Sequence, residues 1–102
     1  MRLKTPSGHV FVRCEDIIHL DACGSYTNIF VRNIKEFFHE SHRLGYFCIK
    51  LKDNPEFCRI HKSYCVNVNY IGNDEGKNVF LKDGAYCPVS RTGKKILKQQ
   101  LA

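Results

Sequence analysis

Short apolar segments alternate with turn residues along most of this chain, and this pattern restricts the fold more than any other feature of the sequence. Glycine, proline, asparagine and aspartate recur between the segments, which is typical of β-strands joined by tight turns. The segments expected to form strands are residues 10–12, 17–20, 26–31, 37–40, 64–68, 70–71, 78–82 and 85–89. The sequence therefore predicts a mostly β fold built from short strands.

Two segments depart from the strand pattern and predict helices, one in the middle of the chain and one at its C-terminus. In residues 43–52 the apolar side chains recur at the i, i+3, i+4 and i+7 spacing of a helix face, and Pro55 follows as a helix breaker. The second helix is expected over residues 91–101, with Ser90 as its N-cap. The apolar side chains of this helix expected to face the protein are Ile96, Leu97 and Leu101.

Asp83-Gly84 is the strongest local hairpin signal in the chain. A two-residue Asp-Gly loop favours a type I′ turn. Such a loop would pair Leu81 with Tyr86 and Val79 with Pro88. Because Pro88 has no N–H to donate, its strand is expected at the edge of a sheet.

The charge balance of the chain points to a polyanionic partner. Its 102 residues include 16 Lys and Arg against 10 Asp and Glu, which gives a net charge of +6. A single basic domain of this size most often meets nucleic acid. Two short runs concentrate hydrogen-bond donors, since residues 57–67 place Arg, His, Lys and Ser between apolar residues, and residues 88–91 add another Ser and Arg. These runs predict a surface that binds phosphates and reads base edges.

The residue types in these two runs suggest separate roles in such a surface. Lys62 and Arg91 have long cationic side chains suited to the O6 and N7 atoms of guanine. Lys94 and Lys95 would lie in the first turn of the last helix, where cations oppose the helix dipole unless a phosphate is nearby. The alternative for these two lysines is a simple solvated helix face. The side chains able to donate to phosphate or to bases are Asn28, Ser63 and Ser90.

Other classes of function find less support in the sequence. The six cysteines contain no C-x-x-C pair, so the spacing of known zinc sites is absent, and Cys48, Cys65 and Cys87 are expected in the core. No nucleophile motif, phosphate-binding glycine loop or paired carboxylate motif occurs, so we expect no enzyme activity, cofactor or metal. No apolar run approaches the ~20 residues of a membrane span. Without a signal peptide, we expect a reduced, cytoplasmic protein that makes no membrane contact through this domain.

The run Phe57-Cys58-Arg59-Ile60-His61-Lys62-Ser63-Tyr64-Cys65-Val66-Asn67 resembles the F-x-R-I-H-[RK]-S-[YF]-x-V-N signature of the LytTR-type DNA-binding domain. The likeness extends to residues 16–22, 24–26, 83–84 and 88–91, so it covers nearly the whole chain in the right order. The resemblance implies an elongated array of short antiparallel sheets with roughly ten strands. It also implies the effector domain of a bacterial response regulator.

The resemblance further implies that loops on one face enter successive major grooves of DNA and bend the duplex. The positions of this sequence that correspond to the contacting residues are Thr27 or Asn28, Lys62 and Arg91. Two neighbours of Lys62 are further candidates, each with an alternative role. His61 either contacts DNA or pins the loop through hydrogen bonds of its ring, and Arg59 either contacts DNA or forms an ion pair with a carboxylate.

The partners follow from the same resemblance. They are double-stranded DNA with repeated half-sites, a second copy of the domain on that DNA, and a receiver or sensor domain outside this chain. Residues 1–102 are accordingly expected to be one DNA-binding domain taken from a larger transcriptional regulator. Two alternatives remain open. One is an RNA-binding or single-strand-binding β module that stacks bases on its aromatic side chains, and the other is a protein-interaction domain whose charge serves solubility.

Overall fold

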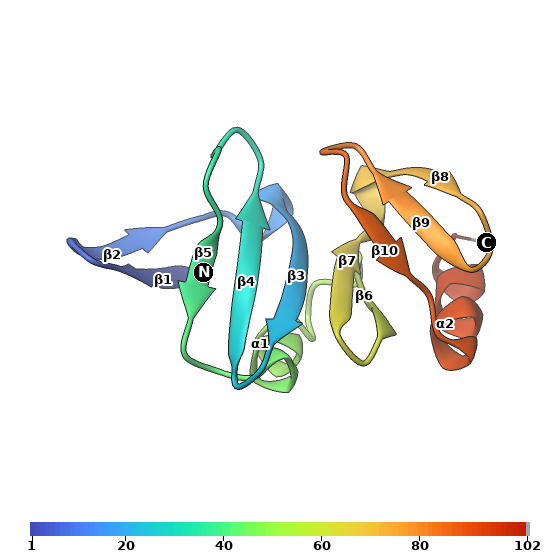
Figure 1. Ribbon diagram of the computed structural model, residues 1–102, viewed down its shortest axis with the longest axis horizontal. Coiled ribbons are helices and arrows are strands. Elements are labelled where there is room, and N and C mark those ends of the chain that lie inside the picture. Colours follow the sequence, from blue (N-terminus) through green and yellow to red (C-terminus); the bar gives the residue numbers. More distant parts are fainter. Residues whose placement is uncertain (102) are drawn as a thin grey trace.

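The strands of this protein form an elongated body of 40 × 25 × 24 Å, with one helix near its middle and one at its C-terminal end (Figure 1). The computed structural model describes residues 1–101, which contain ten strands and two α-helices. The strands are β1 Arg2–Thr5, β2 Gly8–Phe11, β3 Ile17–Cys23, β4 Tyr26–Val31, β5 Phe38–Glu40, β6 Phe57–His61, β7 Tyr64–Asn67, β8 Ile71–Asp74, β9 Asn78–Leu81 and β10 Tyr86–Pro88. The helices are α1 Leu44–Lys50 and α2 Arg91–Leu101, and single 3-10 turns occupy Cys14–Asp16 and Val68–Tyr70. The predicted mostly β fold is therefore confirmed.

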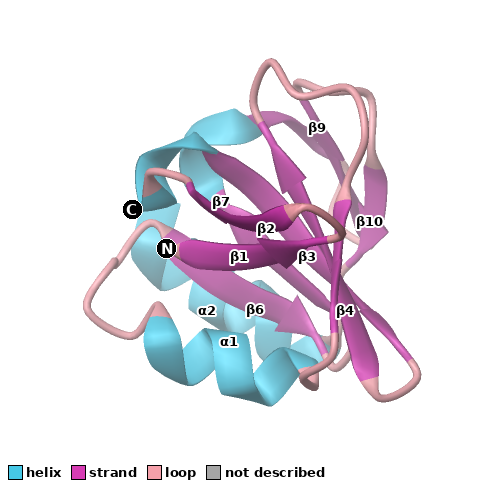
Figure 2. Ribbon diagram, turned by 90° about the vertical axis from the view of Figure 1, so that its left-hand side faces the viewer, coloured by secondary structure: helices cyan, strands magenta, loops and turns pink. Residues whose placement is uncertain are grey.

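The strands of residues 1–101 pair in three antiparallel sheets. The largest has the order β5-β4-β3-β7-β6, the second has the order β10-β9-β8, and β1 pairs with β2 alone. Seen along the long axis, both helices lie at one side of the molecule, with β4, β9 and β10 at the other (Figure 2). Within these residues no helix is long and apolar enough to cross a lipid bilayer.

Two hydrophobic cores share the five-stranded sheet. Ile17 and Leu20 of β3 join one core while Ile18 joins the other. Strict alternation would separate Ile17 from Leu20, but the register shift between Ile17 and His19 changes the face of the side chains that follow. The first core packs α1 against β3 and β4 through Leu44 and Phe47. The second core joins β6 and β7 to the three-stranded sheet and α2, and its buried members are Ile18, Cys58, Ile60, Val66, Val79, Leu81, Cys87 and Leu97. This second core sets the position of α2 relative to β6.

The β9–β10 hairpin corrects the predicted register by one residue. The observed partners are Phe80 with Tyr86, Val79 with Cys87, and Asn78 with Pro88. Gly84 adopts φ 91°, and its N–H donates to the carbonyl of Leu81 at 2.9 Å, so Lys82, Asp83 and Gly84 form a three-residue loop. Asp83 does not take the positive φ that a type I′ turn requires of both central residues. β10 lies at the edge of its sheet, as the proline predicts.

The C-terminal helix has the predicted bounds and the predicted cap, since the Oγ of Ser90 accepts a hydrogen bond from the N–H of Gly93 at 3.0 Å. Leu97 is buried and Ile96 is half-buried, whereas the prediction for Leu101 is wrong because its side chain is 50% exposed. The first turn of α2 packs closely on β6, and Gly93 is buried there. The middle helix is shorter than its predicted range of 43–52.

Several strands differ from the predicted pattern, since β2 begins at Gly8 rather than residue 10 and β3 continues to Cys23 past the predicted residue 20. β1 was not predicted, because Leu3 is its only fully buried apolar residue, and β6 lies within the run that the sequence presents mainly as a cationic loop. β8 extends beyond the predicted residues 70–71. The expected core cysteines Cys65 and Cys87 are buried, while Cys48 is half-buried.

Candidate nucleic-acid interface

Three turns of the chain lie along one long edge of the molecule, at the bottom of Figure 1. They are the β3–β4 turn at residues 24–25, the β6–β7 turn at residues 62–63, and the start of α2 at residues 90–91. The last two are joined directly, because the N–H of Ser90 donates to the carbonyl of Ile60 at 2.7 Å. The structure therefore brings together the two donor-rich runs that the sequence singled out.

The β6–β7 turn is held in shape by its own side chains. A guanidinium N–H of Arg59 donates to the carbonyl of Lys62 at 2.7 Å, and the N–H of Ser63 donates to the Nδ1 of His61 at 3.1 Å. The carbonyl of Ser63 accepts from the N–H of Ala22 on β3 at 2.8 Å, which ties the turn to the central strand. The side chain of Lys62 is exposed at the tip of this braced turn.

These contacts match one of the two roles predicted for His61, and contact of its ring with DNA stays a prediction. Because Nδ1 accepts the hydrogen bond, the proton of the neutral ring is carried by Nε2. His61 therefore braces the loop through its ring, and its Nε2 is not used by this hydrogen bond. Arg59 forms no ion pair with a carboxylate in residues 1–101, so that predicted alternative is not observed.

The start of α2 presents its cations while its polar cap is occupied. The half-buried hydroxyl of Ser90 accepts the N–H of Gly93 at the helix N-terminus, and its own O–H can still donate. Arg91, Lys94 and Lys95 are exposed. Gly93 lies so close to β6 that a Cβ atom on it would be 1.9 Å from the carbonyl oxygen of Ile60. This close approach fixes the start of α2, and with it Arg91, beside the strand that leads to Lys62.

The β3–β4 side of the edge corrects one predicted contact. Thr27 is wholly buried, and its hydroxyl donates to the carbonyl of His42 at 2.7 Å. Its side chain is therefore not presented to a partner, and Asn28 is the residue of this pair that reaches the surface. The Oδ1 of Asn28 lies 2.6 Å from the Nδ1 of His39, whose ring stacks on Tyr26 at 4.7 Å between centroids. The sequence did not single out His39, because only the pairing of β4 with β5 brings it beside Asn28.

The cations of this edge form no ion pairs within residues 1–101. In the part of the chain that the structure describes, the ion pairs join Arg13 to Glu15 and Arg32 to Asp16, and the ring of His19 contacts two carboxylates. None involves the cationic side chains of the edge, which are Arg59, Lys62, Arg91, Lys94 and Lys95. Their charge is therefore available to a polyanion.

Comparison with known proteins identifies the family of the chain. The model of the LytTr DNA-binding domain family matches residues 7–102. The chain belongs to this family. The sensory transduction protein LytT of Bacillus subtilis (strain 168) is 34% identical to this LytTR domain over 106 residues, covering 99% of the chain and 43% of the relative. LytT of Bacillus anthracis is 29% identical over 97 residues, covering 90% of the chain and 38% of the relative.

This LytTR domain also has the fold of a solved relative. The LytTr DNA-binding domain of a methyl-accepting/DNA response regulator from Bacillus cereus matches it with a TM-score of 0.80 at 24% identity. The match covers 100% of this chain and 95% of that one. The domain spans less than half the length of the two LytT proteins.

Proposed function

We propose that this LytTR domain binds double-stranded DNA with sequence specificity, by inserting the turns of its long edge into the major groove. The observation that carries this proposal is the joined pair of exposed cations, Lys62 on the β6–β7 turn and Arg91 at the start of α2. Both side chains lack an ion-pair partner among residues 1–101, and hydrogen bonds hold the backbone around each of them in place.

The proposed contacts lie at separate places along the long axis of the molecule. The β3–β4 turn lies at one part of this edge and the start of α2 at another (Figure 1). This separation along one face supports contact with the duplex at more than one place.

Each exposed side chain of the edge has a distinct role in this proposal. Lys62 and Arg91 donate to the acceptors of guanine in the major groove. Ser63, Lys94 and Lys95 bind phosphates and set the position of the domain on the duplex. A phosphate near the first turn of α2 also offsets the unfavourable placement of two lysines at the positive end of the helix dipole.

The larger setting is that of a bacterial transcriptional response regulator in the cytoplasm. Supporting this are the LytT relatives, which are sensory transduction proteins more than twice as long as this domain. In this proposal a receiver or sensor domain outside residues 1–102 controls binding, and two copies of the domain occupy repeated half-sites.

Selection of bound duplexes from a random library, followed by affinity measurements, tests the proposal. Arg91→Ala should lose about 1–3 kcal/mol of binding free energy on the selected site and little on scrambled DNA, because a base contact is lost. Lys94→Ala should weaken binding to both duplexes and reduce the salt slope by about one unit. Lys82→Ala is a matched control, since this exposed lysine lies in the β9–β10 loop at the opposite edge (Figure 1).

Two outcomes would contradict the proposal. In one, Arg91→Ala weakens selected and scrambled duplexes equally, which removes the base-reading role. In the other, single-stranded oligonucleotides compete better than any selected duplex, which would instead favour stacking of bases on exposed aromatic side chains.

A further inference from the structure

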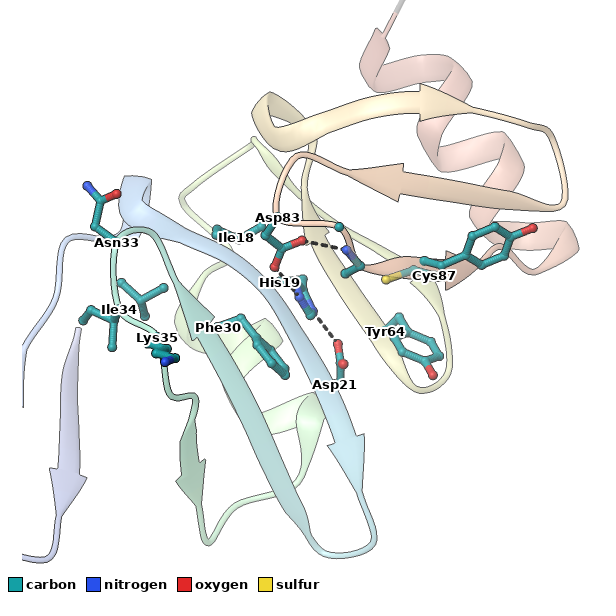
Figure 3. Close-up of a pocket in the computed structure, with 14 residues that line it drawn as sticks. Ile18, His19, Asp21, Phe30, Asn33, Ile34, Lys35, Tyr64, Asp83 and Cys87 are labelled. Atoms are coloured by element: carbon teal, nitrogen blue, oxygen red, sulfur yellow. Dashed lines mark hydrogen bonds and ion pairs between the residues drawn. The ribbon is translucent and has the colours of Figure 1, made fainter.

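A second polar cluster lies away from the proposed DNA edge, where the five-stranded and three-stranded sheets meet (Figure 3). At its centre is the ring of His19 on β3, which is only 2% exposed. Its Nδ1 lies 2.7 Å from Oδ1 of Asp21, and its Nε2 lies 3.0 Å from Oδ2 of Asp83 in the β9–β10 loop. Cys87 on β10 completes the cluster, and the ligand atoms of His19, Asp21 and Cys87 all lie within 4.8 Å of one another.

The groups of this cluster carry more negative than positive charge. Two carboxylates and a thiol surround a single imidazole, and a neutral imidazole can donate only one N–H to the two carboxylates that face it. Burial, together with the charges of Asp21 and Asp83, raises the pKa of the Cys87 thiol to about 12, so this thiol keeps its proton at neutral pH. Such a cluster offers nitrogen, oxygen and sulfur donors, and neither Asp21 nor Asp83 has a Lys or Arg ion-pair partner among residues 1–101.

We propose that His19, Asp21 and Cys87 form a binding site for a divalent metal ion of the zinc type. A mixed set of imidazole, carboxylate and thiolate donors suits zinc or cobalt, whereas calcium and magnesium take oxygen ligands. Metal–ligand bonds of about 2.0–2.3 Å in a tetrahedron bring ligand atoms to roughly 3.3–3.6 Å of one another. The Nδ1 of His19 lies 2.7 Å from the Oδ1 of Asp21, and the three ligand atoms all lie within 4.8 Å of one another. Small movements of these side chains would therefore bring the atoms to tetrahedral spacing.

The surroundings fit the other requirements of a metal centre. With Nδ1 on the metal, the Nε2–H of His19 keeps its hydrogen bond to Asp83, an outer carboxylate that fixes the ring. Phe30 stacks on the same ring at 4.1 Å between centroids and holds its plane. The cluster opens into a cleft of about 780 Å³, which gives an entry path and room for water as a fourth ligand. Binding releases the thiol proton of Cys87 to solvent as the thiolate joins the metal.

The position of the site links it to the architecture. His19 and Asp21 belong to the central strand of the five-stranded sheet, whereas Cys87 belongs to the edge strand that leads into Ser90 and Arg91. A bound metal ion would join the two sheets directly. Metal binding should therefore raise the unfolding temperature of the domain, because an ion that binds only the folded state stabilises it.

Titration of the metal-free, reduced chain with Zn²⁺ and with Co²⁺ tests this site. We expect one ion per chain and a thiolate-to-cobalt charge-transfer absorption. Cys87→Ser should abolish that absorption and weaken Zn²⁺ binding at least tenfold, and Asp83→Asn should weaken it by about 10–100-fold through the ring of His19. Cys23→Ser is the matched control, because this exposed cysteine ends β3 outside the cluster and should bind metal like the unmodified chain.

Asp21→Asn keeps the proposal testable if Cys87→Ser does not fold, since the side chain of Asp21 is only partly buried and the change preserves its shape. We expect at least a tenfold loss of Zn²⁺ affinity in this variant. Unchanged Zn²⁺ affinity in folded Asp21→Asn, or Co²⁺ binding without a thiolate band in the unmodified chain, would overturn the metal site.

Discussion

Replacing Gly93 by alanine should destabilise the domain strongly, although alanine is the better helix former. The added Cβ atom would lie 1.9 Å from the carbonyl oxygen of Ile60 and 2.5 Å from its carbonyl carbon. Because Cβ atoms essentially never approach such atoms within 3.0 Å, α2 and β6 would have to separate by about 1 Å. The same movement would stretch the hydrogen bond from Ser90 to Ile60, which is 2.7 Å long.

The size of this effect follows from three contributions. Overpacking in a tight contact costs about 1–3 kcal/mol, and a lost backbone hydrogen bond costs about 1 kcal/mol. The better helix propensity of alanine returns up to about 1 kcal/mol. The net loss of about 1–3 kcal/mol should lower the unfolding temperature by roughly 5–20 °C for a domain of this size.

Thermal and urea unfolding followed by circular dichroism measure this loss, and a second glycine provides the control. A Cβ on Gly45 in α1 would meet only the Nη1 of Arg59, at an ordinary contact distance of 3.7 Å. Gly45→Ala should therefore leave stability unchanged or raise it by up to about 1 kcal/mol. If Gly93→Ala proved as stable as Gly45→Ala, the close seating of α2 on β6 would be refuted.

Three further predictions concern the cap, the corrected contact and the cysteines. Ser90→Ala should cost about 1 kcal/mol in urea unfolding because the N–H of the first helical turn loses its acceptor, and an unchanged midpoint would argue against the cap. Thr27→Val removes the hydrogen bond to the carbonyl of His42, so stability should fall by about 1 kcal/mol. The affinity of the folded variant for the selected duplex should not change, and a loss of affinity would show that this residue contacts DNA. The hydrogen bond with Cys65, aided by the Arg59 guanidinium, outweighs desolvation and lowers the pKa of Cys48 to about 7, so its alkylation by iodoacetamide should reach half its maximal rate near that pH. In Cys65→Ala the midpoint should rise toward 9, and a midpoint that stays near 7 would exclude this cause.

The parts of the fold predicted correctly from the sequence are those with a local chemical cause. The bounds of α2 follow from a cap at Ser90 and a helical pattern after it, and β4 follows from alternation over Tyr26–Val31. The register of the β9–β10 hairpin was missed because Asp-Gly suits both a two-residue loop and the end of a three-residue loop. Only the burial of Val79 opposite Cys87 in the second core distinguishes the two.

The candidate site shows the same division between local and distant causes. Lys62 and Arg91 are recognisable because each lies in a short run rich in donors. The burial of Thr27 depends on the carbonyl of His42, which lies 15 residues away in the chain. The cluster around His19 depends on Asp83, which lies 64 residues away in the chain. No spacing of cysteine or histidine residues in the sequence predicts this cluster.

Amide chemical-shift mapping of the whole chain with its selected duplex tests the central claim most directly. The account predicts that the largest changes fall at residues 24–28, 62–63 and 91–95, which lie along one edge of the molecule (Figure 1). Changes concentrated instead at residues 33–36 and 82–84, the loops of the opposite edge, would contradict it.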